Sequence, residues 1–201
     1  YDAFLRPAHR FASLLVKEGI GPSARVAVQV RKSPEALALY AGCIAAGAVF
    51  LPLNTAYTAS EVAYFAENAQ PGLLVCDPAA EASLAPVAKE AGARLLTLAG
   101  DGSGTLAEAA AACPDRFDPV PRGADDLAAL LYTSGTTGRS KGAMLTQHNL
   151  LSNARSLVEA WRFGPGDVLL HALPIFHTHG LFVACNVVLL SGGAMIFLPA
   201  F

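Results

Sequence analysis

Charged residues are scarce in this sequence of 201 residues. Asp, Glu, Lys and Arg together make up 15% of it, whereas soluble proteins average about 25%. Hydrophobic residues make up 53%. A chain with so few charges suggests that part of its surface is normally covered by other protein. We therefore expect the sequence to be a piece of a longer chain, and its start at Tyr1 without Met agrees with this expectation.

An excess of positive charge is also missing. The 16 acidic and 14 basic side chains give a net charge of −2, which offers no electrostatic reason to bind nucleic acid or an anionic membrane. The uncharged stretches 36–53 and 168–201 are broken by glycines and prolines. Neither matches the roughly 20 unbroken apolar residues of a membrane-spanning helix. We expect neither nucleic acid nor membrane as a partner.

Cysteine is infrequent, and no C-x-x-C pair occurs. The four cysteines are widely spaced and lie in mostly apolar or alanine-rich stretches, at Cys43, Cys76, Cys113 and Cys185. Such cysteines are typical of buried, reduced thiols, which are common in proteins of the cytoplasm. We expect a cytoplasmic protein without structural disulfides.

Segments with strand and helix patterns alternate along the whole sequence. The expected strands are 25–30, 49–53, 73–76, 94–98, 127–132, 143–145, 167–173 and 194–198. The expected helices are 2–18, 34–47, 59–68, 79–91, 106–112, 147–161 and 181–190. Ser33 is expected to cap the second of these helices, and Thr58 with Glu61 the third. The expected apolar face of helix 147–161 consists of Leu150, Leu151, Ala154, Leu157, Val158 and Trp161. Alternation of this kind predicts an α/β fold with a mostly parallel, doubly wound sheet. Three prolines in 114–123 favour a linker there, so we divide the chain into a first α/β lobe (1–113), a linker (114–126) and a second segment (127–201) of one domain.

The stretch 127–142, LAALLYTSGTTGRSKG, has three parts. An apolar run predicts a buried strand, the segment TSGTTG lacks any apolar side chain, and a basic tip ends at Lys141 and Gly142. Glycines let backbone N–H groups approach a phosphate closely, and the hydroxyls supply further donors. The lysine adds a mobile point charge. The pattern therefore predicts an anion-binding loop.

Two other interpretations compete with an anion-binding loop. In a Walker A loop, G-x-x-x-x-G-K-[ST], counting from Gly135 would require glycine at Ser140 and Ser or Thr at Gly142. A Walker loop also opens a helix directly, whereas here the short apolar run 143–145 follows, which predicts strand–loop–strand. A flexible surface loop without function is the plainer alternative, and the apolar strand before it and the lysine after it disfavour that alternative.

The second suggestive stretch is HALPIFHTHG, residues 171–180, which follows a predicted strand. In open α/β sheets, ligands bind outside the carboxyl ends of the strands. One interpretation is core packing by Phe176 with histidines that hydrogen-bond locally. Another is a metal site formed by His171, His177 and His179, although no nearby Cys or carboxylate completes it.

The segment YTSGTTGRSKG resembles the phosphate-loop signature of the adenylate-forming superfamily, which includes acyl-CoA synthetases, luciferases and peptide-synthetase adenylation domains. In most members proline precedes the lysine, and here Ser140 takes that place. The longer stretches LPLNTAYT (51–58), 125–145 and HALPIFHTHGLF (171–182) are similar to bacterial malonyl-CoA synthetases. The resemblance spans nearly the whole chain. It implies part of the large N-terminal domain of such an enzyme and less than half of its length.

The resemblance implies an ATP-dependent acid–CoA ligase. A substrate carboxylate attacks the α-phosphate of ATP to give an acyl-adenylate and pyrophosphate, and CoA then displaces AMP. The implied partners are malonate or methylmalonate, ATP with Mg²⁺, CoA and the remainder of the same chain. Another acyl-CoA synthetase, a carrier-loading adenylation domain and a non-enzymatic nucleotide-binding module remain alternatives.

The resemblance also implies roles for individual residues. Lys141 and His177 would be catalytic, and His177 with Phe176 would contact the acid, because PIFH matches the family's P-x-[FY]-H motif. His179 would be only structural. The ATP phosphates would be held by Thr133, Ser134, Gly135, Thr136, Thr137, Gly138 and Lys141. No metal ligand is expected in this sequence, since the magnesium carboxylate and the cation for the second carboxylate of malonate are expected elsewhere in the chain.

Overall fold

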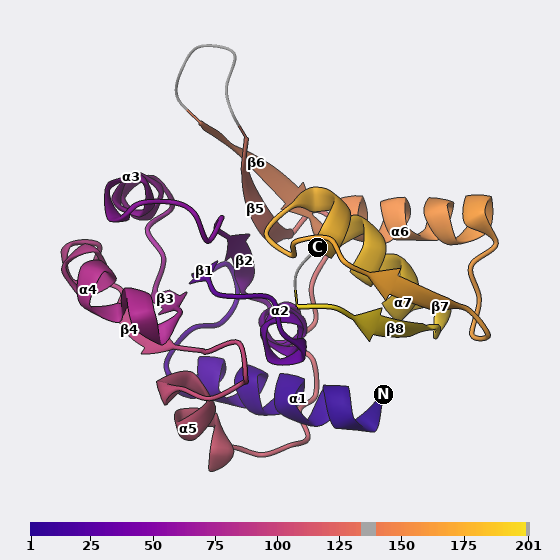
Figure 1. The fold of residues 1–201 in the computed structure, drawn as a ribbon, viewed down its shortest axis with the longest axis horizontal. Helices are drawn as coiled ribbons and strands as arrows, with labels where there is room; N and C mark the ends of the chain where they lie inside the picture. Colours follow the sequence, from indigo (N-terminus) through magenta and orange to yellow (C-terminus); the bar gives the residue numbers. More distant parts are fainter. Residues whose placement is uncertain (134–139, 200–201) are drawn as a thin grey trace.

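The computed structural model describes residues 1–133 and 140–199, in which helices and strands alternate (Figure 1). The helices are α1 (Asp2–Lys17), α2 (Pro34–Ala45), α3 (Ala59–Ala69), η1 (Pro78–Ala80), α4 (Glu81–Glu90), α5 (Thr105–Ala111), α6 (Gln147–Trp161), η2 (His179–Cys185) and α7 (Asn186–Ser191). The strands are β1 (Arg25–Gln29), β2 (Val49–Pro52), β3 (Leu73–Cys76), β4 (Arg94–Thr97), β5 (Leu127–Thr133), β6 (Lys141–Thr146), β7 (Val168–His171) and β8 (Ala194–Phe197).

The main sheet has six strands in the order β4-β3-β1-β2-β5-β6. Five of them run parallel, and β6 pairs antiparallel with β5. Strands β7 and β8 form a separate parallel pair. The predicted α/β fold with a mostly parallel sheet is therefore confirmed.

The sheet is wound in both directions from β1. The chain moves from β1 to β2 through α2, and then returns past β1 to β3 through α3. Because these crossovers run in opposite directions, their helices cover opposite faces of the sheet. Side chains on β1 alternate accordingly: Val26 and Val28 pack in the cluster of α1 and α2, whereas Ala27 packs with Leu51 in the cluster of α3 and α4.

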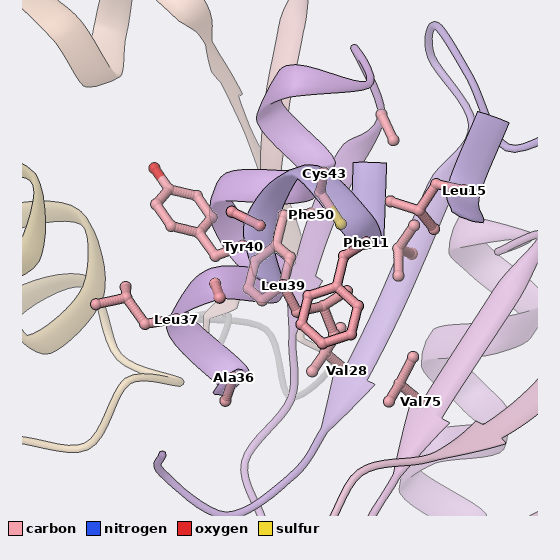
Figure 2. Packing of buried hydrophobic residues seen from close by; sticks show 14 of the residues in the cluster. Phe11, Leu15, Val28, Ala36, Leu37, Leu39, Tyr40, Cys43, Phe50 and Val75 are labelled. Atoms are coloured by element: carbon pink, nitrogen blue, oxygen red, sulfur yellow. The ribbon is translucent and has the colours of Figure 1, made fainter. Parts of the chain in front are cut away.

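Figure 2 shows the larger of these two clusters, in which Phe11 of α1 packs near Val28 and Phe50 of the sheet. The ring of Tyr40 meets that of Phe50 edge to face at a centroid distance of 5.2 Å. Helices α1 and α2 approach closely at Gly42, where an added Cβ would lie 2.8 Å from the carbonyl oxygen of Ala8. A side chain at this position would push the two helices apart.

Two helix starts carry the caps that the sequence predicts. The Ser33 hydroxyl accepts a hydrogen bond from the backbone N–H of Ala36 at 3.0 Å at the start of α2. At the start of α3, Thr58 and Glu61 form a reciprocal capping box. These caps depend on residues three positions apart, so local sequence is sufficient to predict them.

Two expectations about packing were wrong. The apolar run of β5 is not a fully buried strand: only Ala128 and Ala129 are buried, because its neighbour β6 is the edge strand of the sheet. On α6, the predicted apolar face is buried only at Leu150 and Ala154, and Trp161 remains 55% exposed.

The predicted helix 181–190 begins instead as a π-helix, η2, before α7 follows. In its first turn, the Gly180 carbonyl oxygen accepts a hydrogen bond from the His171 ring. A side chain that bonds to a helix carbonyl in this way is a recognised cause of irregular turns.

The segment 114–126, predicted as a linker, lies between α5 and β5 and is hydrogen-bonded to the first lobe. The N–H of Val120 donates to the Ala45 carbonyl oxygen at 2.8 Å. Strands from both sides of the segment share the six-stranded sheet, since β5 pairs with β2. The division into lobes at this segment stays a prediction. Within residues 1–133 and 140–199, no helix combines the length and apolar character needed to cross a bilayer.

Candidate functional site

The carboxyl ends of the five parallel strands lie at one edge of the main sheet. The segments that follow β1, β2 and β5 therefore emerge at the same edge. The neighbouring strands β1 and β2 lead into helices on opposite faces, so a crevice opens between their carboxyl ends. This topological switch point is where ligands bind in open α/β sheets.

A cavity of about 600 Å³ occupies this crevice. Its walls come from five separate segments of the chain, namely those after β1, β2, β4, β7 and β8. The lining residues are Val30, Arg31, Lys32, Thr55, Gly100, Ala172, Pro174, Ile175, Phe176 and Pro199. The structure thus brings the PIFH segment to the carboxyl edge of the main sheet, although β7 belongs to the other sheet.

The predicted phosphate loop is carried by a β-hairpin. Thr133 at the end of β5 faces Lys141 at the start of β6, and both residues are exposed. The strands predicted on either side of the loop are confirmed as β5 and β6. Five further residues predicted to bind phosphate lie outside the described residues, namely Ser134, Gly135, Thr136, Thr137 and Gly138.

A hydrogen bond from His171 holds the loop that contains the PIFH segment, residues 174–177. The residue is buried, and its Nε2 lies 2.7 Å from the Gly180 carbonyl oxygen. Because a carbonyl oxygen only accepts, the proton of the ring must sit on Nε2. The Cys185 thiol donates to the same oxygen at 3.1 Å. Burial lowers the pKa of His171, so the ring is neutral at pH 7.

Gly180 allows this loop to close tightly. A Cβ at Gly180 would lie 2.0 Å from the Pro174 carbonyl oxygen, a distance that no side chain can occupy. The segment 171–180 is thus pinned at both ends, by the His171 ring and by the close backbone contact. This arrangement presents Ile175 and Phe176 to the cavity as parts of a fixed wall.

The three histidines of this segment do not converge. His177 and His179 are exposed, whereas His171 is buried against Gly180. In the described part of the chain, no three His, Cys, Asp or Glu side chains form a group that could hold a metal ion. The ring of Phe176 is half-buried and lies 5.2 Å, centroid to centroid, from that of His177.

Lys32 is a cavity residue that was not predicted. Its ammonium group donates to the His171 carbonyl oxygen at 2.7 Å and lies 4.4 Å from the centre of the Phe197 ring. Burial lowers the pKa of Lys32. The sequence signal was a basic pair, Arg31 and Lys32, directly after a predicted strand, but its partners lie more than 100 residues away.

Comparison with known proteins was consistent with this geometry. The chain matches the family model described as AMP-binding enzyme over residues 1–201. It is similar to the crystal structure of ATP-bound MatB from Rhodopseudomonas palustris, with 56% identity, a TM-score of 0.95, and coverage of 98% of this chain and 39% of that chain.

Two curated relatives are similar at lower identity. A sulfoacetate–CoA ligase of Cupriavidus necator is 32% identical over 179 residues, which are 89% of this chain and 35% of the relative. A malonate–CoA ligase of Arabidopsis thaliana is 32% identical over 190 residues, which are 92% of this chain and 31% of the relative. The chain thus spans about a third of the length of these relatives.

Proposed function

Because this chain belongs to the family of AMP-binding enzymes, we propose that it is part of an ATP-dependent acid–CoA ligase that activates malonate or a close dicarboxylate. In the proposed reaction, a carboxylate oxygen bonds to the α-phosphorus of ATP and pyrophosphate leaves. The thiol of CoA then attacks the acyl carbon, and AMP leaves as the thioester forms. The observation that carries this proposal is the 56% identity with ATP-bound MatB over 98% of the chain.

The hairpin of β5 and β6 would hold the triphosphate of ATP. Thr133 and Lys141 stand at its neck, and we assign the phosphate contacts to these two residues and to residues 134–138 between them. Adenylyl transfer depends mainly on positioning and on stabilising negative charge. The ammonium of Lys141 would neutralise charge as pyrophosphate forms.

The wall formed by residues 171–180 would contact the acid. Phe176 lines the cavity at the switch point, and the exposed His177 follows it directly. An imidazole N–H at this position could donate to the carboxylate or to the forming acyl-phosphate oxygen. We assign this role to His177 and a packing role to Phe176.

The choice of malonate is supported by the names of the relatives. One relative is a malonate–CoA ligase and the other a sulfoacetate–CoA ligase. Both acids carry a second anionic group beside the reacting carboxylate, so a preference for small dianionic acids is the common element. Sulfoacetate is therefore the second candidate substrate. The cation that would meet this second group, and the contacts of CoA, are assigned to the remainder of the enzyme.

Magnesium would be bound mainly by the phosphates of ATP, which it commonly bridges. The described residues offer it no cluster of ligands, and we assign no step to a metal ligand of this chain. A cytoplasmic location is supported by the four cysteines, which are all free and buried.

The test is acid-dependent exchange of pyrophosphate into ATP by the full-length enzyme. The panel is malonate, methylmalonate, sulfoacetate, acetate and ferulate, with a reaction without acid as control. We expect malonate or methylmalonate to give the highest kcat/KM, about tenfold or more above acetate, because a second anionic group adds a charge-assisted contact. A preference for acetate or ferulate, or no exchange with any acid, would overturn the proposal.

A further inference from the structure

The hairpin of β5 and β6 has little support from the sheet itself. Strand β6 is the last strand of the sheet and pairs only with β5 among the described strands. Residues 141–144 of β6 are exposed. In Figure 1 the hairpin extends beyond the other strands, on the side where α3 lies. Its direction must therefore be fixed by contacts other than strand pairing.

Helix α3 supplies those contacts on both sides of the hairpin, to β5 and to the residue just before β6. The Tyr64 hydroxyl donates to the Ser140 carbonyl oxygen at 3.0 Å. The Tyr132 hydroxyl donates to Oδ1 of Asn68. Tyr64 and Asn68 are four residues apart, so they lie on the same face of the helix, one turn from each other. One face of α3 is thus hydrogen-bonded both to the end of β5 and to the residue just before β6.

A cluster of aromatic rings stabilises this contact between α3 and the hairpin. The ring of Phe65 lies 4.5 Å from that of Tyr132, 5.0 Å from that of Tyr57 and 5.4 Å from that of Tyr64, measured between centroids. Phe65 is buried against the sheet together with Val62. The helix is therefore anchored to the core on the same side that holds the hairpin.

We propose that Tyr64 and Asn68 are positioning residues for ATP, which set the direction of the phosphate hairpin from outside the nucleotide site. The Ser140 carbonyl belongs to the peptide unit that joins Ser140 to Lys141. Holding this carbonyl fixes the peptide plane from which the Lys141 side chain departs. Unlike proline, serine leaves its own φ unrestrained, so the hydrogen bond from Tyr64 supplies a restraint that the residue does not.

This inference rests on the proposed function, in which Lys141 meets the triphosphate. The experiment uses three variants of the full-length enzyme, Tyr64→Phe, Tyr132→Phe and the control Tyr57→Phe. Each removes one hydroxyl and keeps the ring of the same aromatic cluster. The Tyr57 hydroxyl makes no hydrogen bond within the described part of the chain, so its loss should leave the hairpin in place.

We expect Tyr64→Phe and Tyr132→Phe each to raise KM for ATP about three- to tenfold in the pyrophosphate exchange assay, which corresponds to one lost hydrogen bond. KM for the acid and the Tm should stay at the wild-type values, and Tyr57→Phe should match the wild type throughout. If the two hydroxyls had only a structural role, Tyr64→Phe and Tyr132→Phe would lower the Tm and leave KM for ATP at the wild-type value. That result, or equal KM for ATP in all three variants, would overturn the proposal.

Pyrophosphate exchange by the wild-type enzyme distinguishes a failure of the positioning proposal from a failure of the proposed ligase function. If the wild type exchanges pyrophosphate but Tyr64→Phe and Tyr132→Phe behave like Tyr57→Phe, positioning by α3 is wrong and the ligase function stands. If the wild type gives no acid-dependent exchange, the ligase function is wrong. The positioning role is then decided by the Kd for MgATP in calorimetry, where the same three- to tenfold weakening is expected. A wild type that binds no MgATP would overturn both.

Discussion

Lys141 is placed at the neck of the hairpin and not at its tip. It faces Thr133 across the first pair of β5 and β6, so the backbone that carries it is held by strand pairing. A lysine on such a base can deliver its ammonium to a phosphate while losing less main-chain freedom than a lysine in a loop. At the scale of the residue, this is the position with the most direct consequence for chemistry.

We expect Lys141→Ala to slow pyrophosphate exchange by about tenfold or more in the full-length enzyme, because a positive charge opposite the developing charge is lost. The matched control is Lys89→Ala, which removes an exposed lysine from the last turn of α4. Exchange at the wild-type rate in Lys141→Ala would contradict the role assigned to this lysine.

The two exposed histidines of the PIFH segment give a second comparison between residues. His177 follows Phe176, which lines the cavity, whereas His179 opens the π-helix η2. We expect His177→Ala to reduce adenylate formation or the affinity for the acid more than His179→Ala does. The measurement is kcat and KM for the acid in both variants, and the same kinetics in the two would count against His177.

At the scale of the element, the loop between β7 and η2 depends on the absence of a side chain at Gly180. We expect Gly180→Ala to lower the free energy of unfolding by about 1–3 kcal/mol, because the new methyl group collides with the Pro174 carbonyl. Urea unfolding of the full-length enzyme measures this change.

Gly166→Ala is the matched control for that substitution. Gly166 lies in the turn between α6 and β7, and a Cβ there meets open space. Its effect should stay within about 0.5 kcal/mol. If the two alanine variants were equally stable, the backbone contact at Gly180 would not constrain the loop.

The sequence predicted those elements whose causes are local. Ser33 and Thr58 cap helices through residues three positions away, and both caps are present. The π-helix η2 could not be predicted, because it involves a ring nine residues earlier in the chain. The contact of Tyr64 with Ser140 could not be predicted either, because 76 residues separate the partners and no short motif marks them.

For the candidate site, the sequence predicted the two segments but not how each is held. The loop pattern around Lys141 and the PIFH segment were identified from short motifs, and both lie at the carboxyl edge of the main sheet. The support from Lys32 and Asn68 depends on which strands become neighbours. Strand order is a property of the folded chain that alternating helix and strand patterns leave open.

At the scale of the whole molecule, apolar surface gathers on the second part of the chain. Trp161 of α6, Val168 and Leu170 of β7 and Ile196 of β8 are each more than half exposed. Strands β7 and β8 make only a two-stranded sheet in the described part, and such pairs are rarely stable without a covering layer. In the longer relatives, additional chain is available to cover this face.

We expect purified residues 1–201 to form no detectable malonyl-adenylate and to bind a hydrophobic dye strongly, because the apolar face stays open to solvent. The full-length enzyme is the control, and it should form the adenylate and bind the dye weakly. Detection of malonyl-adenylate by mass spectrometry with residues 1–201 alone would contradict this expectation.

The four buried thiols can also report on local opening of the structure. Burial raises the pKa of Cys76 to about 11 and that of Cys185 to about 12, so neither is an effective nucleophile while the structure is closed. Alkylation can then proceed only through transient opening around each sulfur. Cys76 ends a strand of the main sheet and Cys185 ends the π-helix. Their two labelling rates would therefore measure local opening of the sheet and of the region packed against residues 171–180 separately.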